Sequence, residues 1–180
     1  MLIRNLLLAQ HDGNGAIVLA GPATGMVRLL NLYGARPQIA AKVKYLVVAI
    51  GAFGPNAEPE ASVKADIAAA RTLFAEWPTP IIVAGREVGE AFPYPGSSIE
   101  TDFSWSPAHP IADAYRLAGR MPYNAPAPAL AAVTYAVQDN EDLFGLSEPG
   151  TVTVGADGRT TFTPDPNGTH RHLIADPLQK

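Results

Sequence analysis

Three short apolar runs, each closed by a glycine, constrain the fold of this chain most. They are Ala16–Ala20, Tyr45–Ile50 and Thr79–Ala84. Uninterrupted runs of this length are typical of strands that are buried on both faces of a parallel sheet. Segments with helical periodicity separate them, at about 24–33, 37–43 and 63–77. The alternation predicts an α/β fold in which helices flank a largely parallel sheet.

The last third of the chain has a different pattern. Polar and apolar residues alternate in Thr151–Gly155 and Thr160–Thr163, on either side of Asp157-Gly158, which predicts a C-terminal β-hairpin. His170–Ile174 is expected to add a last edge strand. Before the hairpin we expect a long surface loop over 92–98 and helices at 110–117 and 130–137, each helix with proline at or just before its start.

Composition limits the classes of protein that need be considered. With 180 residues, 47% of them hydrophobic and 17% charged, the chain is expected to form one domain over 1–180 with an ample core. The net charge of −4 and the lack of a long basic run argue against nucleic-acid and membrane partners. The chain has no cysteine, which excludes disulfides and thiolate chemistry and fits a cytoplasmic protein.

The N-terminal residues predict a helix, with Leu2, Leu6 and Ala9 on one stripe. Because a domain of this class rarely begins within a helix, we expect that an upstream part is missing. A sheet without its first strand and helix would expose an edge or an apolar face. We therefore expect a homo-oligomer, or a partner chain that covers this surface.

Met121–Val137 predicts a loop that leads into an apolar helix. The N-terminus of a helix is a favoured place for a carboxylate or phosphate group, because free N–H groups and the helix dipole converge there. Here that place holds Pro126, Ala127, Pro128 and Ala129. The start of this helix is therefore placed like a binding site but lacks polar side chains that could bind a ligand.

Ligands of parallel sheets bind beyond the carboxyl ends of the strands. This rule nominates four loops: 21–25, 51–62, 85–90 and 121–129. The first is more simply a tight strand-to-helix turn with Thr24 as helix N-cap, and it lacks the pattern of a nucleotide-phosphate loop. The carboxylates Glu58, Glu60 and Asp66 could simply be solvated or lie in a first helical turn, where negative charge is favourable.

In the loop at 85–90, Arg86, Glu87 and Glu90 could form a surface ion pair or flank a pocket, and the surface role is the simpler interpretation. The four histidines have no metal-ligand spacing on a helix, so they do not predict a zinc site. The residues on their own therefore predict a fold and candidate loops, but no reaction.

Six sequence blocks carry a family resemblance that extends over essentially the whole chain. They are Gly21–Gly25, Lys42–Phe53, Glu60–Arg71, Glu76–Glu90, Met121-Pro-Tyr and Asp142-Leu-Phe-Gly. In this order they resemble the nucleoside hydrolase family, the inosine–uridine-type N-ribohydrolases. The resemblance is to the later part of a family member.

The resemblance implies an activity and a metal. Family members hydrolyse the N-glycosidic bond between ribose and base, with a bound calcium ion that holds the attacking water and the ribose hydroxyls and an aspartate that acts as base. A cage of carboxylate oxygens suits such a hard cation, which positions and acidifies water. The family's N-terminal aspartate cluster, which supplies the base and most calcium ligands, has no counterpart in this chain.

The resemblance also assigns roles to single positions. Thr24 matches a threonine whose backbone carbonyl contacts calcium, and Glu60 matches the ribose-binding glutamate. Three further ribose-site positions hold different residues: Gly25 and Ser62 replace asparagines, and Ala49 replaces a methionine. Ala129 stands where relatives have a late calcium-binding aspartate, in a segment rewritten as Ala-Pro-Ala-Pro-Ala.

These replacements predict a nucleoside-hydrolase-like domain that is catalytically silent as this chain, a pseudoenzyme with its calcium site lost and no bound cofactor. Weak binding of a nucleoside, a ribosyl group or another small polar ligand through Glu60 and Ser62 is compatible with this. The alternative is a working calcium-dependent N-ribohydrolase acting on purine or pyrimidine ribonucleosides. Its missing carboxylates would then come from an upstream segment or a partner chain.

Overall fold

The computed structural model describes residues 2–138 and 143–175, so Asp142 of the Asp142-Leu-Phe-Gly block lies outside the described residues. The helices are α1 Leu2–Leu8, α2 Thr24–Leu30, α3 Ala35–Lys42, α4 Ala61–Ala65, α5 Ile67–Glu76, α6 Arg86–Ala91, α7 Gly96–Asp102, α8 Pro110–Ala118 and α9 Pro128–Gln138. The strands are β1 Gly15–Leu19, β2 Val43–Val48, β3 Ile81–Val83, β4 Phe144–Leu146, β5 Gly150–Val154, β6 Thr160–Pro164 and β7 His170–Ala175.

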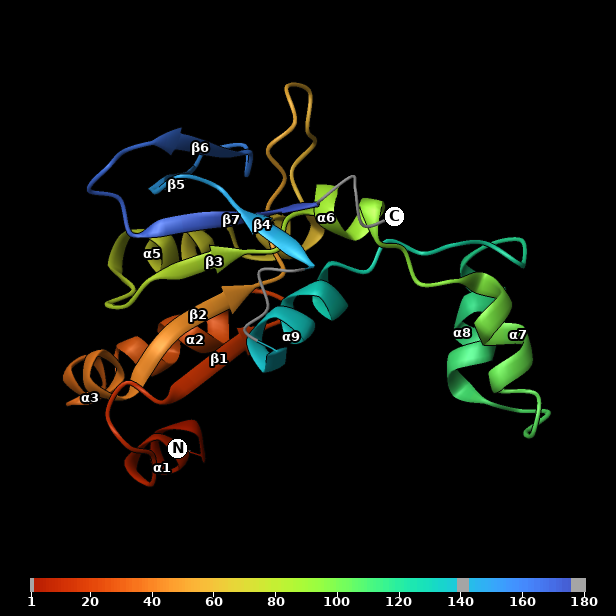
Figure 1. Cartoon of the computed structure of the whole chain (residues 1–180), viewed down its shortest axis with the longest axis horizontal. Coiled ribbons are helices and arrows are strands. Elements are labelled where there is room, and N and C mark those ends of the chain that lie inside the picture. The colour runs from red at the N-terminus through yellow and green to blue at the C-terminus, as the bar shows by residue number, and fades with distance from the viewer. Residues whose placement is uncertain (1, 139–142, 176–180) are drawn as a thin grey trace.

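The strands described here form one mixed sheet in the order β1-β2-β3-β7-β5-β6, with β4 paired to β7 (Figure 1). β1, β2, β3 and β7 run parallel to one another, whereas β5 is antiparallel to β7. β5 and β6 form an antiparallel hairpin, and β4 is antiparallel to β7. The predicted α/β class, the parallel run and the C-terminal hairpin are therefore confirmed.

Strand β2 shows why an uninterrupted apolar run is needed here. Leu46 and Val48 lie in a core with α2, α3 and α5, whereas Tyr45 and Val47 lie in a second core with α9. Successive side chains of a strand point to opposite faces, so a strand covered on both sides needs apolar residues at every position. Complete burial of Leu46 alone stabilises the fold by about 2 kcal/mol.

The chain changes face after β3. The connections β1-to-β2 and β2-to-β3 contribute α2, α3 and α5 to one face of the sheet, whereas α6 and α9, which follow β3, pack on the other. Figure 1 shows α9 on one side of the sheet and α2 and α5 on the opposite side. The loops after β2 and β3 thus leave the sheet in opposite directions, an arrangement that opens a crevice at the carboxyl edge of parallel sheets.

Three sequence expectations about single elements were wrong. β7 is an internal strand and not an edge strand, because it pairs with β3 on one side and with β5 and β4 on the other. The expected helix over 63–77 is divided at Asp66, whose non-helical backbone ends α4 and whose side chain caps the start of α5. The expected loop at 92–98 gives way to α7 from Gly96.

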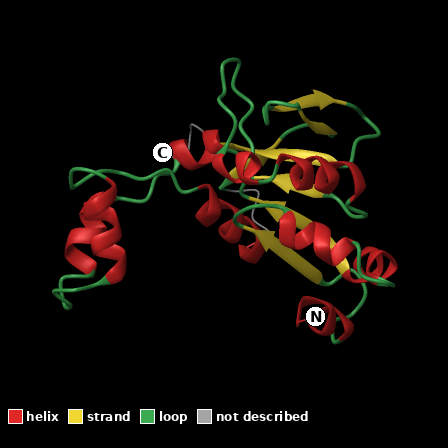
Figure 2. Cartoon of the chain, turned by 180° about the vertical axis from the view of Figure 1, so that it is seen from behind, coloured by secondary structure: helices red, strands yellow, loops and turns green. Residues whose placement is uncertain are grey.

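Two features lie at the periphery of the sheet. In α1 the predicted stripe is exposed, and Leu7 is the residue that packs into the core. The pair α7 and α8 stands apart from the sheet, on two long connections, in both views (Figures 1 and 2). A backbone pairing of Tyr94 with Ala125 joins these two connections. Across the described residues, no helix combines the length and apolar character that a membrane span requires.

Candidate functional site

The carboxyl ends of β1, β2, β3 and β7 lie at one edge of the sheet, because these strands are parallel. The loops that follow β1, β2 and β3 carry most of the residues that the sequence singled out. Two groups of side chains can be distinguished there. One holds the residues assigned by family resemblance, and the other surrounds a cavity beside β7.

Thr24 is the first residue of α2, and its hydroxyl donates a hydrogen bond of 2.6 Å to Asp66 Oδ2. The other oxygen of Asp66 accepts from the backbone N–H of Ala69 at 2.9 Å and so caps α5. The hydrogen bond from Thr24, followed by that from Ala69, lowers the pKa of Asp66 below its usual value. The expectation of Thr24 as N-cap was wrong, since Ala23 holds that place.

Glu60 and Ser62 are brought together, as the resemblance implies, but they bond to each other. Glu60 Oε2 accepts from the backbone N–H of Ser62 at 2.9 Å, which caps α4. Glu60 Oε1 accepts from Ser62 Oγ at 3.3 Å, a long and therefore weak hydrogen bond. This pair is partly exposed, so the long bond is the one that a ligand hydroxyl could displace.

The remaining positions carry no polar side chain. Ala49 is buried against α9 in the second core, and its N–H donates to Leu19 O. Gly25 is exposed and lines a cavity of about 370 Å³ beside α1. Ala129 is exposed in the first turn of α9. Within residues 2–138 and 143–175, no three His, Asp or Glu side chains gather closely enough to hold a metal ion.

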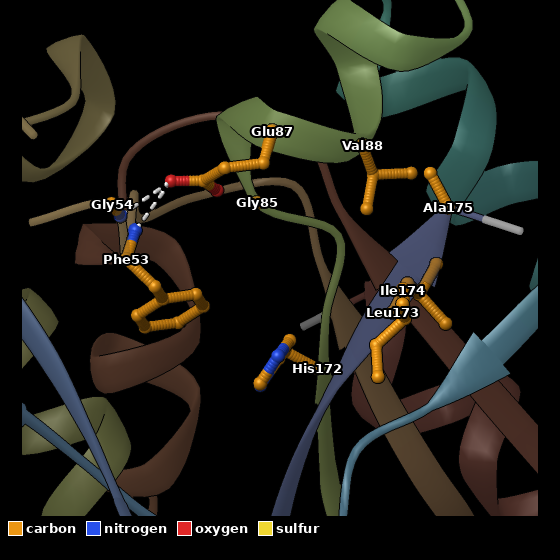
Figure 3. Close-up of a pocket in the computed structure, with 9 residues that line it drawn as sticks. All are labelled: Phe53, Gly54, Gly85, Glu87, Val88, His172, Leu173, Ile174 and Ala175. Atoms are coloured by element: carbon orange, nitrogen blue, oxygen red, sulfur yellow. Dashed lines mark hydrogen bonds between the residues drawn. The ribbon is translucent and has the colours of Figure 1, made fainter. Parts of the chain in front are cut away.

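Two polar residues to which the resemblance assigned no role, Glu87 and His172, line a largely apolar cavity of about 260 Å³ at the same edge (Figure 3). Glu87 lies in the first turn of α6, and its Oε1 accepts from the backbone N–H groups of Phe53 at 2.6 Å and Gly54 at 2.9 Å. Glu87 therefore ties the loop after β2 to the helix after β3. Of the two roles considered for it, flanking a pocket is the one that the structure supports.

His172 of β7 lies across this cavity from Glu87. Its ring centroid is 5.3 Å from that of Phe53 and 4.7 Å from that of Phe162. Burial lowers the pKa of His172, and this effect outweighs the opposing effect of the Glu87 carboxylate, so the imidazole is neutral at pH 7. The sequence offered no signal for this residue, because its position depends on β7 joining the sheet beside β3.

The fold is similar to that of solved nucleoside hydrolase structures. The chain aligns with an inosine-uridine preferring nucleoside hydrolase from Bacillus anthracis over 97% of its own length, with a TM-score of 0.66 and 18% identity. It aligns with an inosine-guanosine nucleoside hydrolase over 99% of its length, with a TM-score of 0.73 and 17% identity. At the level of sequence, no family model and no curated protein matches the chain.

At these identities the comparison shows a shared fold. The chain spans 60% and 63% of the lengths of the two solved structures. The predicted resemblance is confirmed for the fold, whereas the roles assigned to Thr24, Gly25, Ala49, Glu60, Ser62 and Ala129 remain predictions.

Proposed function

We propose that this chain is a nucleoside-hydrolase-like domain that is catalytically silent as it stands and binds a small polar ligand weakly. The proposal rests on one observation: the carboxylates at the carboxyl edge of the sheet already serve structural roles. Glu60, Asp66 and Glu87 each accept hydrogen bonds from backbone N–H groups that hold a helix or loop in place. Carboxylates committed in this way are poor candidates for a general base or for a calcium cage.

Calcium does not fit the residues that the resemblance assigns to it. Calcium prefers six to eight oxygen ligands, most of them from carboxylates and carbonyls. Thr24 offers a backbone carbonyl, but Ala129 offers only a methyl group. The carboxylate of Asp66, the N-cap of α5, is held by Thr24 and Ala69. We therefore derive no catalytic step through a metal.

The proposed ligand contact is the exposed side of the Glu60–Ser62 pair. A vicinal diol, such as that of a ribosyl group, could donate to Glu60 Oε1 in place of Ser62 Oγ. Because the exchanged hydrogen bond is weak and partly exposed, we expect low affinity.

The alternative, a working N-ribohydrolase, is favoured by one observation. The two structural neighbours carry more than a third of their length beyond the part that this chain covers. Carboxylates from a corresponding upstream segment, or from a partner chain, would then complete the calcium site. The cytoplasm remains the proposed compartment under either function.

An assay of base release from inosine, guanosine and uridine, with calcium present, distinguishes the silent domain from the working hydrolase. The proposal expects no turnover above the rate without protein. The Glu60→Ala variant has a matched control in Glu58→Ala, since Glu58 forms an exposed ion pair with Arg159. Turnover that Glu60→Ala abolishes and Glu58→Ala preserves would establish the alternative.

We propose a second copy of this chain as the partner at the free edge of β1. Strand β1 contains neither charge nor proline, the features that commonly protect an edge strand. Beside it, Leu2, Leu6 and Leu8 of α1 are 74%, 57% and 62% exposed. Asp12 forms an ion pair with Lys42, so two copies of this surface would meet with little like-charge repulsion.

A further inference from the structure

We propose that the cavity between the ends of β3 and β7 binds a small organic cation with a flat apolar body, such as an arylamidinium or arylammonium ion. This site is separate from the Glu60–Ser62 pair and does not depend on the function proposed above. Its residues come from α6, from β7 and from the loops after β2 and β3, which converge only in the folded chain. Figure 3 shows Phe53, Glu87 and His172 around the cavity.

The cavity exists because two paired strands separate. β3 and β7 are in register from Ile81↔His170 to Val83↔His172, and β3 ends there. The chain then turns toward β2, since the N–H of Ala84 donates to Val48 O and that of Arg86 donates to Gly51 O. β7 continues to Ala175, supported on its other side by β4. The space left on the β3 side is the cavity of about 260 Å³.

A fixed carboxylate borders this space. Two backbone N–H groups hold Glu87 Oε1, so the carboxylate is oriented before any ligand arrives, while Oε2 has no hydrogen-bond partner among the described residues. Nor does Glu87 form an ion pair with any Lys, Arg or His within residues 2–138 and 143–175. The charge at the cavity is therefore negative and not compensated by a neighbouring cation.

The other residues that line the cavity favour a ligand with a flat apolar framework. Phe53 contributes an aromatic ring, and Val88, Leu173 and Ile174 contribute apolar surface. An aromatic ring next to a carboxylate attracts an organic cation through both the ring quadrupole and the charge. The neutral imidazole of His172 adds a polar edge without cancelling that charge. An anion of the same shape would meet only repulsion from Glu87.

Three probes of nearly identical shape test the proposal: benzamidine, benzamide and benzoate, which are positive, neutral and negative at pH 7. Each is titrated against the full chain while the backbone amide resonances of Gly54, Gly85 and Ala175 are followed by NMR. We expect benzamidine to shift these resonances with a Kd on the order of 1 mM, as a ligand of this size in an open site allows. Benzoate should leave them unchanged.

The variant Glu87→Gln removes the charge but keeps a side-chain oxygen that can accept from Phe53 and Gly54, so the loop should stay in place. We expect it to weaken benzamidine binding about fivefold, whereas Glu90→Gln, an exposed residue of the same helix, should leave binding unchanged. A second variant, Phe53→Leu, keeps the charge and removes the aromatic ring, and should also weaken binding. Equal binding of the three probes, no binding, or full affinity in both variants would overturn the proposal.

Discussion

His170 lies where the parallel and antiparallel parts of the sheet meet. It is only 4% exposed, and its Nδ1 accepts a hydrogen bond of 2.8 Å from the backbone N–H of Val152. Burial lowers the pKa of His170 below the usual value of 6.5, so the folded state keeps this imidazole neutral. The position was interpreted from the sequence as part of an edge strand, since a histidine next to polar residues carries no burial signal of its own.

A stability profile against pH tests this role. A depressed pKa in the folded state means that the unfolded chain takes up the proton first, so the contribution of His170 is complete above pH 6.5 and is lost as pH falls below that value. We expect His170→Asn to flatten the fall in unfolding free energy below pH 6.5, since Asn can still accept from Val152 but does not titrate. Urea unfolding from about pH 8 to pH 5 measures this.

A second variant, His170→Ala, is the control in the same unfolding experiment. Above pH 6.5, His170→Ala should cost about 2 kcal/mol or more, because it leaves the Val152 N–H buried without a partner. A wild-type profile that stays parallel to that of His170→Asn across the range would contradict the assignment.

At the scale of elements, the packing of α6 against the start of α9 connects the loop after β3 to the rewritten Ala-Pro-Ala-Pro-Ala segment. Ala127 N–H donates to Gly89 O at 3.0 Å, and a Cβ built on Gly89 would lie 2.4 Å from Pro128 Cδ. The close approach requires a glycine at 89. Ala129 follows this contact in the first turn of α9, and the role that the resemblance assigns to it stays a prediction.

Two helical glycines form a matched pair for testing this contact. We expect Gly89→Ala to destabilise the chain by about 1–3 kcal/mol, because the added methyl group meets backbone and ring atoms of Pro128. Gly25→Ala meets nothing within 4 Å and lies in α2, so it should be neutral or stabilise by up to about 1 kcal/mol. Thermal and urea unfolding of both variants measures the difference, and equal effects would refute the packing argument.

The predictable elements are those whose packing follows from a local sequence pattern. The apolar run around Leu46 and Val47 predicted a strand with two covered faces, and the glycine-bearing turn near Asp157 predicted the hairpin. Elements that depend on distant partners were missed. The cavity at Glu87 and His172 needs β7 beside β3, a pairing between residues almost ninety positions apart that no local spacing specifies.

At the scale of the whole molecule, β1 is an end strand of the sheet: among the described residues it pairs with β2 alone, and α1 lies beside it. The N–H of Ala49 donates to Leu19 O, so Leu19 faces β2, and alternation directs the backbone groups of Ala16 and Val18 away from the sheet. A second copy could pair there antiparallel and bring the exposed leucines of α1 together.

Light scattering during size-exclusion chromatography tests this dimer. We expect twice the monomer mass for the wild type, and the monomer mass for Ala16→Pro, which deletes an outward N–H without breaking a bond to β2. Leu6→Lys should act likewise, whereas Leu117→Lys, on α8 and 89% exposed, should leave the dimer intact. A wild type that stays monomeric at high concentration, or an Ala16→Pro variant that stays dimeric, would contradict the proposal.

The central claim, that this nucleoside-hydrolase-like fold is catalytically silent as the present chain, is tested most directly by a single measurement of base release. The purified chain is incubated with inosine, guanosine and uridine in the presence of calcium, and free base is quantified by chromatography. We expect the same rate as in buffer alone, since Ala129 offers no ligand and Glu60 is held by Ser62. Calcium-dependent turnover that disappears with Glu60→Ala would contradict it.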